Sequence, residues 1–276
     1  MPTHSHQHRI MSNDGEQEHC EGSSRTATSA KSRVAVVPPP ESTFSRIEPG
    51  PRQPVFDFYK DSPSPLWGIT VRLDVTALRN LCRKQDVGQP SFNFLQASLF
   101  LFAKTANQYA PMRYRIRTDG KTGAKYMICH EYVHPSITIM RRDGSDTYGY
   151  CFWKATDTYP EFSAYATAVL EDFHGQTSRG LDGNPRDDVM HGSVLPWLDF
   201  TSYEHAVGRL TMTSIPKYTF GKIVQDATTG QYSQALALHV HHGCMDGLHV
   251  GRFVELLQDN LNNAESLVAG EATSGT

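Results

Sequence analysis

The stretch HVHHGCMDGLHVGRF, residues 239–253, holds four histidines and one acidic residue within fifteen positions. The strand-like run QALALHVHHG (234–243) leads into it, and side chains alternate between the two faces of a strand. Alternation places His242 on the same face as three apolar residues, Leu236, Leu238 and Val240. Apolar neighbours disfavour a charged imidazole, so the pattern predicts a shielded, neutral His242 that can accept a proton.

Other interpretations of the motif stay open at this point. His242 could be a core histidine that is bonded to backbone. A zinc site needs three or four convergent ligands, whereas strand alternation points His241 away from His242. Cys244 could be a nucleophile with His242 as its base, but a pair two residues apart across a turn favours a packing thiol. Asp246 and Gly247 form a tight turn, in which the carboxylate either polarises His242 or holds the turn through an ion pair.

Sequence patterns predict the elements that position this motif. They are a strand at 67–75, a helix at 92–109, two strands around a Pro-containing turn at 125–144, a helix at 158–175, a loop at 179–188, a strand pair within 205–238 that turns at 227–230, and an amphipathic helix from His249 onward. Strands and helices without strict alternation are typical of an α+β layer protein with one open sheet.

Composition and charge exclude several classes of protein. The formal net charge is −3 and no Lys/Arg run occurs, so we expect no nucleic-acid partner. No apolar stretch approaches the ~20 residues that cross a bilayer, and the N-terminus lacks the pattern of a secretory signal. Five widely spaced cysteines without CxxC pairs indicate reduced thiols in a cytoplasmic protein.

The chain is expected to contain one folded domain between two tails. Residues 1–43 are rich in His, Ser, Glu and Pro with almost no large apolar residues, so they cannot bury enough surface to offset the entropy of ordering. We therefore predict a disordered tail at 1–43, a single domain at 44–265 and a second disordered tail at 266–276.

HHGCMDGLHVGRF resembles the HHxxxDG signature of the chloramphenicol acetyltransferase family. Further blocks resemble the same family in the same order: RQPVFDFY (52–59), ITVRLDVTAL (69–78), SVLPWLDFTSY (193–203) and YTFGKI (218–223). The resemblance runs from about residue 44 to 262. It implies a two-layer sandwich with one mixed β-sheet and helices on one face.

The same resemblance implies a metal-free acyltransferase that moves acetyl from acetyl-CoA directly to a hydroxyl of chloramphenicol or a similar small molecule, which inactivates the antibiotic. It also implies a homotrimer with the acceptor pocket between subunits. The alternatives are acetylation of another hydroxylated toxin or metabolite, a lipoamide acetyltransferase core, and a metal-binding module built from the histidines. The lipoamide cores usually carry Arg after the signature histidine, where this chain has Gly243.

Family roles transfer to matching positions. His242 matches the general base, and Ser202 matches the serine that hydrogen-bonds the oxyanion. Thr219 matches a threonine that orders a water near the transition state. Asp246 matches a structural aspartate that pairs with an arginine, here Arg52, and breaking a buried pair of this kind costs about 3–5 kcal/mol.

The substrate-binding positions transfer in part. Lys222 matches a lysine that faces the 3′-phosphate of CoA. Phe58, Tyr59 and Tyr148 match aromatic residues of the acceptor pocket, which suit an acceptor with an aromatic ring. Three family residues differ here: a second CoA lysine, an aromatic residue near the adenine and a glutamine are replaced by Asn93, Ile223 and His239.

Overall fold

The computed structural model describes residues 36–84, 92–175, 186–206 and 214–270. Most of the predicted N-terminal tail, part of the C-terminal tail and most of the loop at 179–188 lie outside these residues, so the domain boundaries stay a prediction. The described part of the N-terminal segment contacts the domain, because the backbone N–H of Ser42 donates to Asp188 Oδ2 at 2.8 Å.

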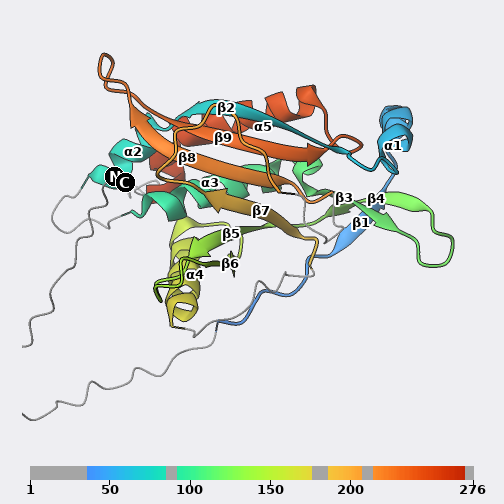
Figure 1. Cartoon of the computed structure of the whole chain (residues 1–276), viewed down its shortest axis with the longest axis horizontal. Coiled ribbons are helices and arrows are strands. Elements are labelled where there is room, and N and C mark those ends of the chain that lie inside the picture. The colour runs from blue at the N-terminus through green and yellow to red at the C-terminus, as the bar shows by residue number, and fades with distance from the viewer. Residues whose placement is uncertain (1–35, 85–91, 176–185, 207–213, 271–276) are drawn as a thin grey trace, which may run out of the picture. The chain divides into compact units, whose positions relative to one another are not determined.

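A six-stranded mixed sheet forms the larger layer of the domain (Figure 1). Its strands, in spatial order, are β2 (Leu66–Asp74), β9 (Tyr232–His241), β8 (Lys217–Gln225), β7 (Val189–Val194), β5 (His134–Met140) and β6 (Tyr148–Phe152). The β5–β7 and β7–β8 pairs are parallel and the other pairs are antiparallel. The predicted strand at 67–75 and the predicted strand pair with its turn at 227–230 are confirmed.

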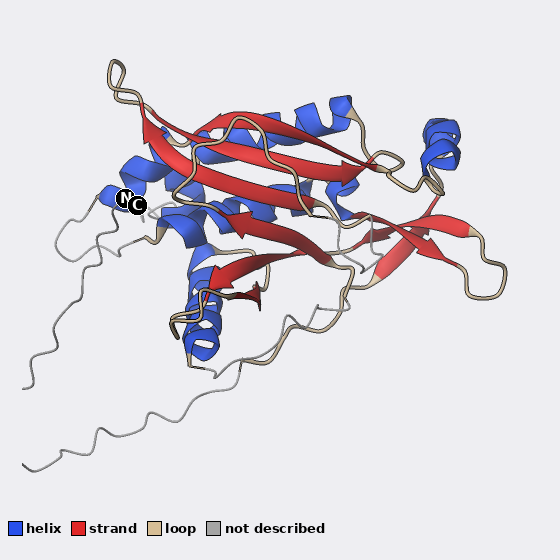
Figure 2. Ribbon diagram, in the orientation of Figure 1, coloured by secondary structure: helices blue, strands red, loops and turns tan. Residues whose placement is uncertain are grey.

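Helices cover one face of this sheet (Figure 2). They are α2 (Thr76–Arg83), α3 (Phe94–Gln108), α4 (Tyr159–His174) and α5 (Gly247–Asn262), and the remaining helical segments are η1 (Gly50–Arg52), α1 (Gln53–Tyr59), η2 (Ala110–Arg113) and η3 (Glu265–Ala269). The predicted α+β sandwich with helices on one face is confirmed.

The core lies between the sheet and α3. This helix is apolar on most sides because the sheet, α4 and α5 all pack against it. Phe102 is fully buried, and its ring centroid lies 4.3 Å from that of Tyr218 and 5.5 Å from that of Phe253. Truncation of such a ring to alanine costs about 3–5 kcal/mol.

A second sheet of three strands joins β1 (Phe44–Ile47), β4 (Lys125–His130) and β3 (Tyr114–Thr118). The segment 125–144 does form two strands, but they lie in different sheets, and the prediction of a Pro-containing turn between them is wrong. Pro135 lies inside β5, where its carbonyl accepts from the N–H of Trp153 at 2.9 Å. Proline has no N–H to donate, so it takes part in the sheet through its carbonyl alone.

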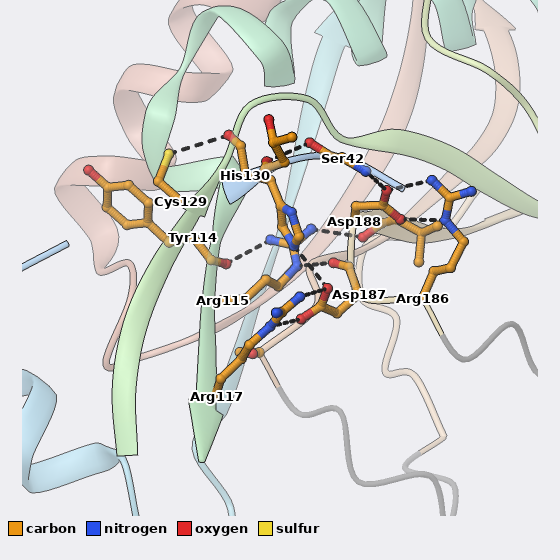
Figure 3. A network of polar contacts seen from close by, with 12 residues as sticks. Ser42, Tyr114, Arg115, Arg117, Cys129, His130, Arg186, Asp187 and Asp188 are labelled. Carbon is orange, nitrogen blue, oxygen red and sulfur yellow. Dashed lines mark hydrogen bonds and ion pairs between the residues drawn. The ribbon is translucent and has the colours of Figure 1, made fainter. Parts of the chain in front are cut away.

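A buried polar network ties the smaller sheet to the start of β7 (Figure 3). Arg115 is fully buried and donates to four backbone carbonyls, including those of Asp187 at 2.6 Å and Val189 at 2.8 Å. Burial lowers the pKa of Arg115 to about 10, which leaves it charged at neutral pH. The Asp187 carboxylate accepts from Arg117 through both oxygens and lies 2.9 Å from His130 Nε2. The network fixes where β7 begins.

Candidate active site

His242 lies in the turn that joins β9 to α5. The strand ends at His241, and the backbone N–H of His242 donates to Pro65 O at 2.9 Å. This hydrogen bond extends the pairing of β2 with β9 by one residue beyond His241. The His242 ring lies beside that of Trp67, whose register partner is Val240, so its side chain lies on the face that alternation predicts. The turn is closed by the N–H of Gly243, which donates to His241 Nδ1 at 3.0 Å.

Two aromatic rings hold the His242 imidazole. Tyr59, the last residue of α1, stacks on it with ring centroids 4.2 Å apart and planes within 10°. Trp67 on β2 lies 5.7 Å from it at a tilt of 46°, and the indole N–H of Trp67 donates to Met245 O at 3.0 Å. His242 Nδ1 is enclosed and makes no hydrogen bond to the described residues. The ring is thus shielded by contacts from distant segments.

Asp246 is the N-cap of α5. Its Oδ1 accepts from the backbone N–H groups of Leu248 at 3.1 Å and His249 at 3.4 Å, and it lies 2.7 Å from His249 Nδ1. A carboxylate is favoured at a helix N-terminus by the exposed N–H groups and by the helix dipole. The helix therefore begins at Gly247, two residues before the predicted start.

Arg52 completes this corner of the site. Its Nη1 forms an ion pair with Asp246 Oδ2, and its Nη2 lies 3.4 Å from the carbonyl oxygen of His242. Desolvation acts to raise the pKa of the Asp246 carboxyl, but hydrogen bonds from His249 and Arg52 outweigh it and hold the pKa below its usual range. The side chains of Arg52 and Asp246 are 25% and 31% exposed. The predicted buried pair is therefore a part-buried one, and its loss should cost less than 3–5 kcal/mol.

The second group of predicted site residues lies on and beside β8. Thr219 is buried opposite Ala237 of β9, and its Oγ1 is 3.1 Å from His205 Nε2. Lys222 is exposed on the same strand, and Ser202 is exposed in the segment that follows β7. Along β9, Ala237 precedes His242 by about five residues, or ~16 Å at ~3.3 Å per residue. Within one chain, the predicted site residues thus form two separate groups, one around His242 and one around β8.

The aromatic residues divide between these regions. Phe58 is 76% exposed, and its ring centroid lies 4.9 Å from that of Tyr59, so both belong to the His242 group. Tyr148 lies on β6, at the opposite edge of the sheet from β2, and is 42% exposed. The chain therefore brings Phe58 and Tyr59 to His242 and leaves Tyr148 apart.

The three departures from the family pattern have local functions in this fold. Asn93 is the N-cap of α3, where its Oδ1 accepts from the N–H of Gln96 at 3.1 Å. Ile223 packs against the core. His239 lies beside His205, with ring centroids 5.0 Å apart. Sequence reasoning missed His205, because it lies in an irregular segment without a periodic pattern that would show which way its side chain points.

Cys244 does not have the environment of a nucleophile. Its thiol is buried, and desolvation raises its pKa to about 12. Among the described residues no group of three or more His, Cys, Asp or Glu side chains is placed to hold a metal ion. In that same part of the chain, none of the helices is both long and apolar enough to cross a membrane.

The fold and the HHxxxDG turn at the end of β9 define an acyltransferase. The family model for chloramphenicol acetyltransferase matches residues 43–258, and the chain belongs to that family. This family uses acetyl-CoA as its co-substrate, so the expected enzyme class and acetyl donor are confirmed.

Curated relatives match over most of their length. The chain is 24% identical to chloramphenicol acetyltransferase 3 of Escherichia coli over 77% of this chain and 93% of that protein. It is 26% identical to chloramphenicol acetyltransferase of Clostridium perfringens over 77% and 94%. Among solved structures, a chloramphenicol acetyltransferase has a TM-score of 0.63 at 19% identity and covers 79% of this chain and 100% of its own.

A probable dihydrolipoamide acetyltransferase from Listeria monocytogenes has a TM-score of 0.54 at 14% identity, over 81% of this chain and 92% of its own. At that identity the likeness concerns the fold alone.

Proposed function

We propose that this protein transfers acetyl from acetyl-CoA to a hydroxyl of chloramphenicol or a similar small molecule, with His242 as the general base. The observation that carries this proposal is the clamped imidazole: Tyr59 and Trp67 hold its ring, and Arg52 reaches its backbone carbonyl. A base must be held in one orientation to meet the proton that it removes. Four described cysteines are free thiols, which supports a reducing, cytoplasmic compartment.

The reaction needs one proton transfer in each direction. Because Nδ1 of His242 is enclosed, Nε2 is the nitrogen that takes the hydroxyl proton. The hydroxyl oxygen then attacks the thioester carbonyl, and Ser202 donates a hydrogen bond to the tetrahedral oxyanion. Collapse of this intermediate breaks the C–S bond, and the leaving CoA sulfur takes the proton back from His242. The products are the acetyl ester and free CoA.

The site residues on and beside β8 are assigned to the binding of acetyl-CoA and of an ordered water. Lys222 is exposed and faces the 3′-phosphate of CoA in this proposal, and Thr219 orders a water near the transition state. Asp246 acts through Arg52 on the conformation of the His242 turn. Phe58, Tyr59 and Tyr148 line the acceptor pocket.

The separation of the two groups supports a homotrimer. Ser202 and Thr219 belong to one region of the chain and His242 to another, so a complete site forms when these regions of two subunits face each other. A heterologous interface that returns on itself after three copies gives a closed ring with three such sites.

An assay of free thiol release tests the reaction. The protein with acetyl-CoA and chloramphenicol should release CoA thiol, and His242→Ala should abolish release while CoA binding and the fold persist. His174→Ala, a histidine substitution on α4, serves as the matched control. Ser202→Ala should lower kcat about a hundredfold or more with little change in KM.

Substrate panels separate the alternatives. Absence of thiol release with every hydroxylated antibiotic and toxin tried would refute the proposal. Turnover with dihydrolipoamide and little with chloramphenicol would favour a lipoamide acetyltransferase instead.

Mixed assemblies test the site between subunits. Co-expression of the His242→Ala and Ser202→Ala chains should restore part of the activity that each lacks alone, because some interfaces then pair an intact His242 with an intact Ser202. A site within one chain would give no such rescue. Light scattering should show three copies, and an active monomer would contradict the trimer.

A further inference from the structure

The helix-free face of the large sheet carries a row of basic side chains. Register places His191 of β7, Lys217 of β8 and His239 of β9 side by side. These three strands are neighbours in the large sheet (Figure 1). Thr219 follows Lys217 by two residues on β8, so both side chains point to this face. The segment after β7 adds His205, whose Nε2 lies 3.1 Å from Thr219 Oγ1. His205, Lys217 and His239 are called the basic cluster below.

The neighbouring strand leaves room for His239. Gly68 of β2 is its partner in the register, and a Cβ at Gly68 would lie 2.4 Å from the His239 ring. His239 is only 9% exposed, and its Nδ1 is enclosed without a hydrogen-bond partner among the described residues. Because Nδ1 is enclosed, Nε2 is the nitrogen of His239 that a ligand can reach.

Lys217 is a half-buried ammonium that forms no ion pair within the described residues. Its amine donates one long hydrogen bond, to Ala206 O at 3.3 Å. Glu204, an acid in the same segment as His205, is exposed and acts on His239. Burial lowers the pKa of Lys217, as expected for a cation that lacks a counter-ion. An unpaired, partly desolvated cation gains most when a ligand brings the missing negative charge.

We propose that the basic cluster binds a carboxylate on the acceptor, so that the preferred acceptor is a hydroxylated organic acid. This inference rests on the proposed function, because Thr219 joins the cluster to the reacting groups. Lys217 supplies the charge, and His205 and His239 supply N–H donors beside it. His191 and Glu204 are the other titratable groups that face the cluster.

Burial also explains why these basic side chains can lie close together without repelling one another. Desolvation lowers the pKa of His205 to about 3 and that of His191 to about 4, so both are neutral at pH 7. Lys217 is then the one cation of the row, and a single carboxylate balances it. Lys222, farther along β8, is exposed and is assigned to the phosphate of CoA.

Matched neutral and anionic acceptors test the inference. Each probe is a hydroxylated aromatic acid that is compared with its own primary amide. One such acid is 4-(hydroxymethyl)benzoate. Another is an analogue of chloramphenicol in which a succinyl group replaces the dichloroacetyl group. Calorimetry on the full-length assembly with CoA bound should show that at least one acid binds about tenfold or more tightly than its amide. Lys217→Met should remove that preference, and Lys121→Met, an exposed lysine in the β3–β4 turn, should keep it.

The outcomes separate this inference from the proposed function. If no acid binds more tightly than its amide, the inference is overturned, even where the neutral compounds are acetylated. If the acids are preferred in binding but no compound is acetylated, the inference holds and the proposed reaction fails. If Lys217→Met raises the KM for acetyl-CoA and leaves the acid preference unchanged, the cluster serves CoA and the inference is overturned.

Discussion

Asp246 offers a quantitative test of how the site is held, because its negative charge can be removed separately from its helix-capping oxygen. Asp246→Asn keeps an oxygen that accepts from the N–H groups of the first turn of α5, but it removes the charge that faces Arg52. Asp246→Ala removes both. Asparagine is as good an N-cap as aspartate, whereas alanine costs about 1 kcal/mol at this position.

The contacts set the size of each effect. A hydrogen bond to a charged group contributes about 1.5–3 kcal/mol when shielded. The side chains of Arg52 and Asp246 are 25% and 31% exposed, so solvent screening reduces this to ~1–2 kcal/mol. We expect a loss in the free energy of unfolding of ~1–2 kcal/mol for Asp246→Asn and ~2–3 kcal/mol for Asp246→Ala.

Urea unfolding at fixed protein concentration measures both values. Trp67 is a suitable fluorescence reporter, since its indole donates to Met245 O beside the Asp246 turn. Asp199→Asn is the matched control. It breaks an ion pair with Arg72 in which both side chains are about 40% exposed, and it should cost under about 0.5 kcal/mol. Equal losses for the asparagine and alanine variants, or losses no larger than that of Asp199→Asn, would refute the reasoning.

The pH dependence has a defined sign. The pKa of Asp246 is lower in the folded state than in the unfolded chain, where it is about 3.9. Its charge therefore stabilises the fold above that value, and the contribution is lost as the pH falls through and below it. The difference in stability between wild type and Asp246→Asn should be constant from about pH 5 to 7 and should shrink below about pH 4.

Three further predictions concern neighbouring side chains. Gly68→Ala should disturb His239, because the new Cβ meets its ring, and adding His239→Ala should remove most of that penalty in urea unfolding; additive losses would show that the two sites are independent. Tyr59→Phe should keep the ring stacked on His242 and retain thiol release, whereas Tyr59→Ala should lower kcat at least tenfold; equal rates would show that stacking is dispensable. Cys244→Ala should keep its rate of acetyl transfer, and loss of the reaction with the fold intact would revive the thiol as nucleophile.

Much of the fold follows from local patterns. The strand β2, the helices α3, α4 and α5, and the β8–β9 pair all lie where periodicity and turn residues predict them. Periodicity cannot show which strands share a sheet. The strands β4 and β5 lie only three residues apart in the chain, yet pairing with β3 and β1 places the first in the smaller sheet, and pairing with β6 and β7 places the second in the larger.

The site was predictable from the sequence where both residues of a contact lie in the matching family motifs. Asp246 and Arg52 are an example, since the resemblance named both partners and the structure places them together. The exact end of the strand was not predictable, because β9 ends at His241, two residues before the end of the run at 234–243, and His242 lies in the turn. His205 was missed for a different reason: its contact with Thr219 depends on the path of an irregular segment across the sheet, which no local period encodes.

The position of β9 has a consequence for how the protein forms during its synthesis. This strand lies between β2 and β8, yet it is the last strand in the described part of the chain. Until residue 241 has left the ribosome, β2 has no described partner and one side of β8 is open, so the nascent chain exposes unpaired strand edges that can join other copies. The segment that carries the proposed base therefore also closes the sheet, and chains truncated before it should aggregate instead of forming an inactive but folded domain.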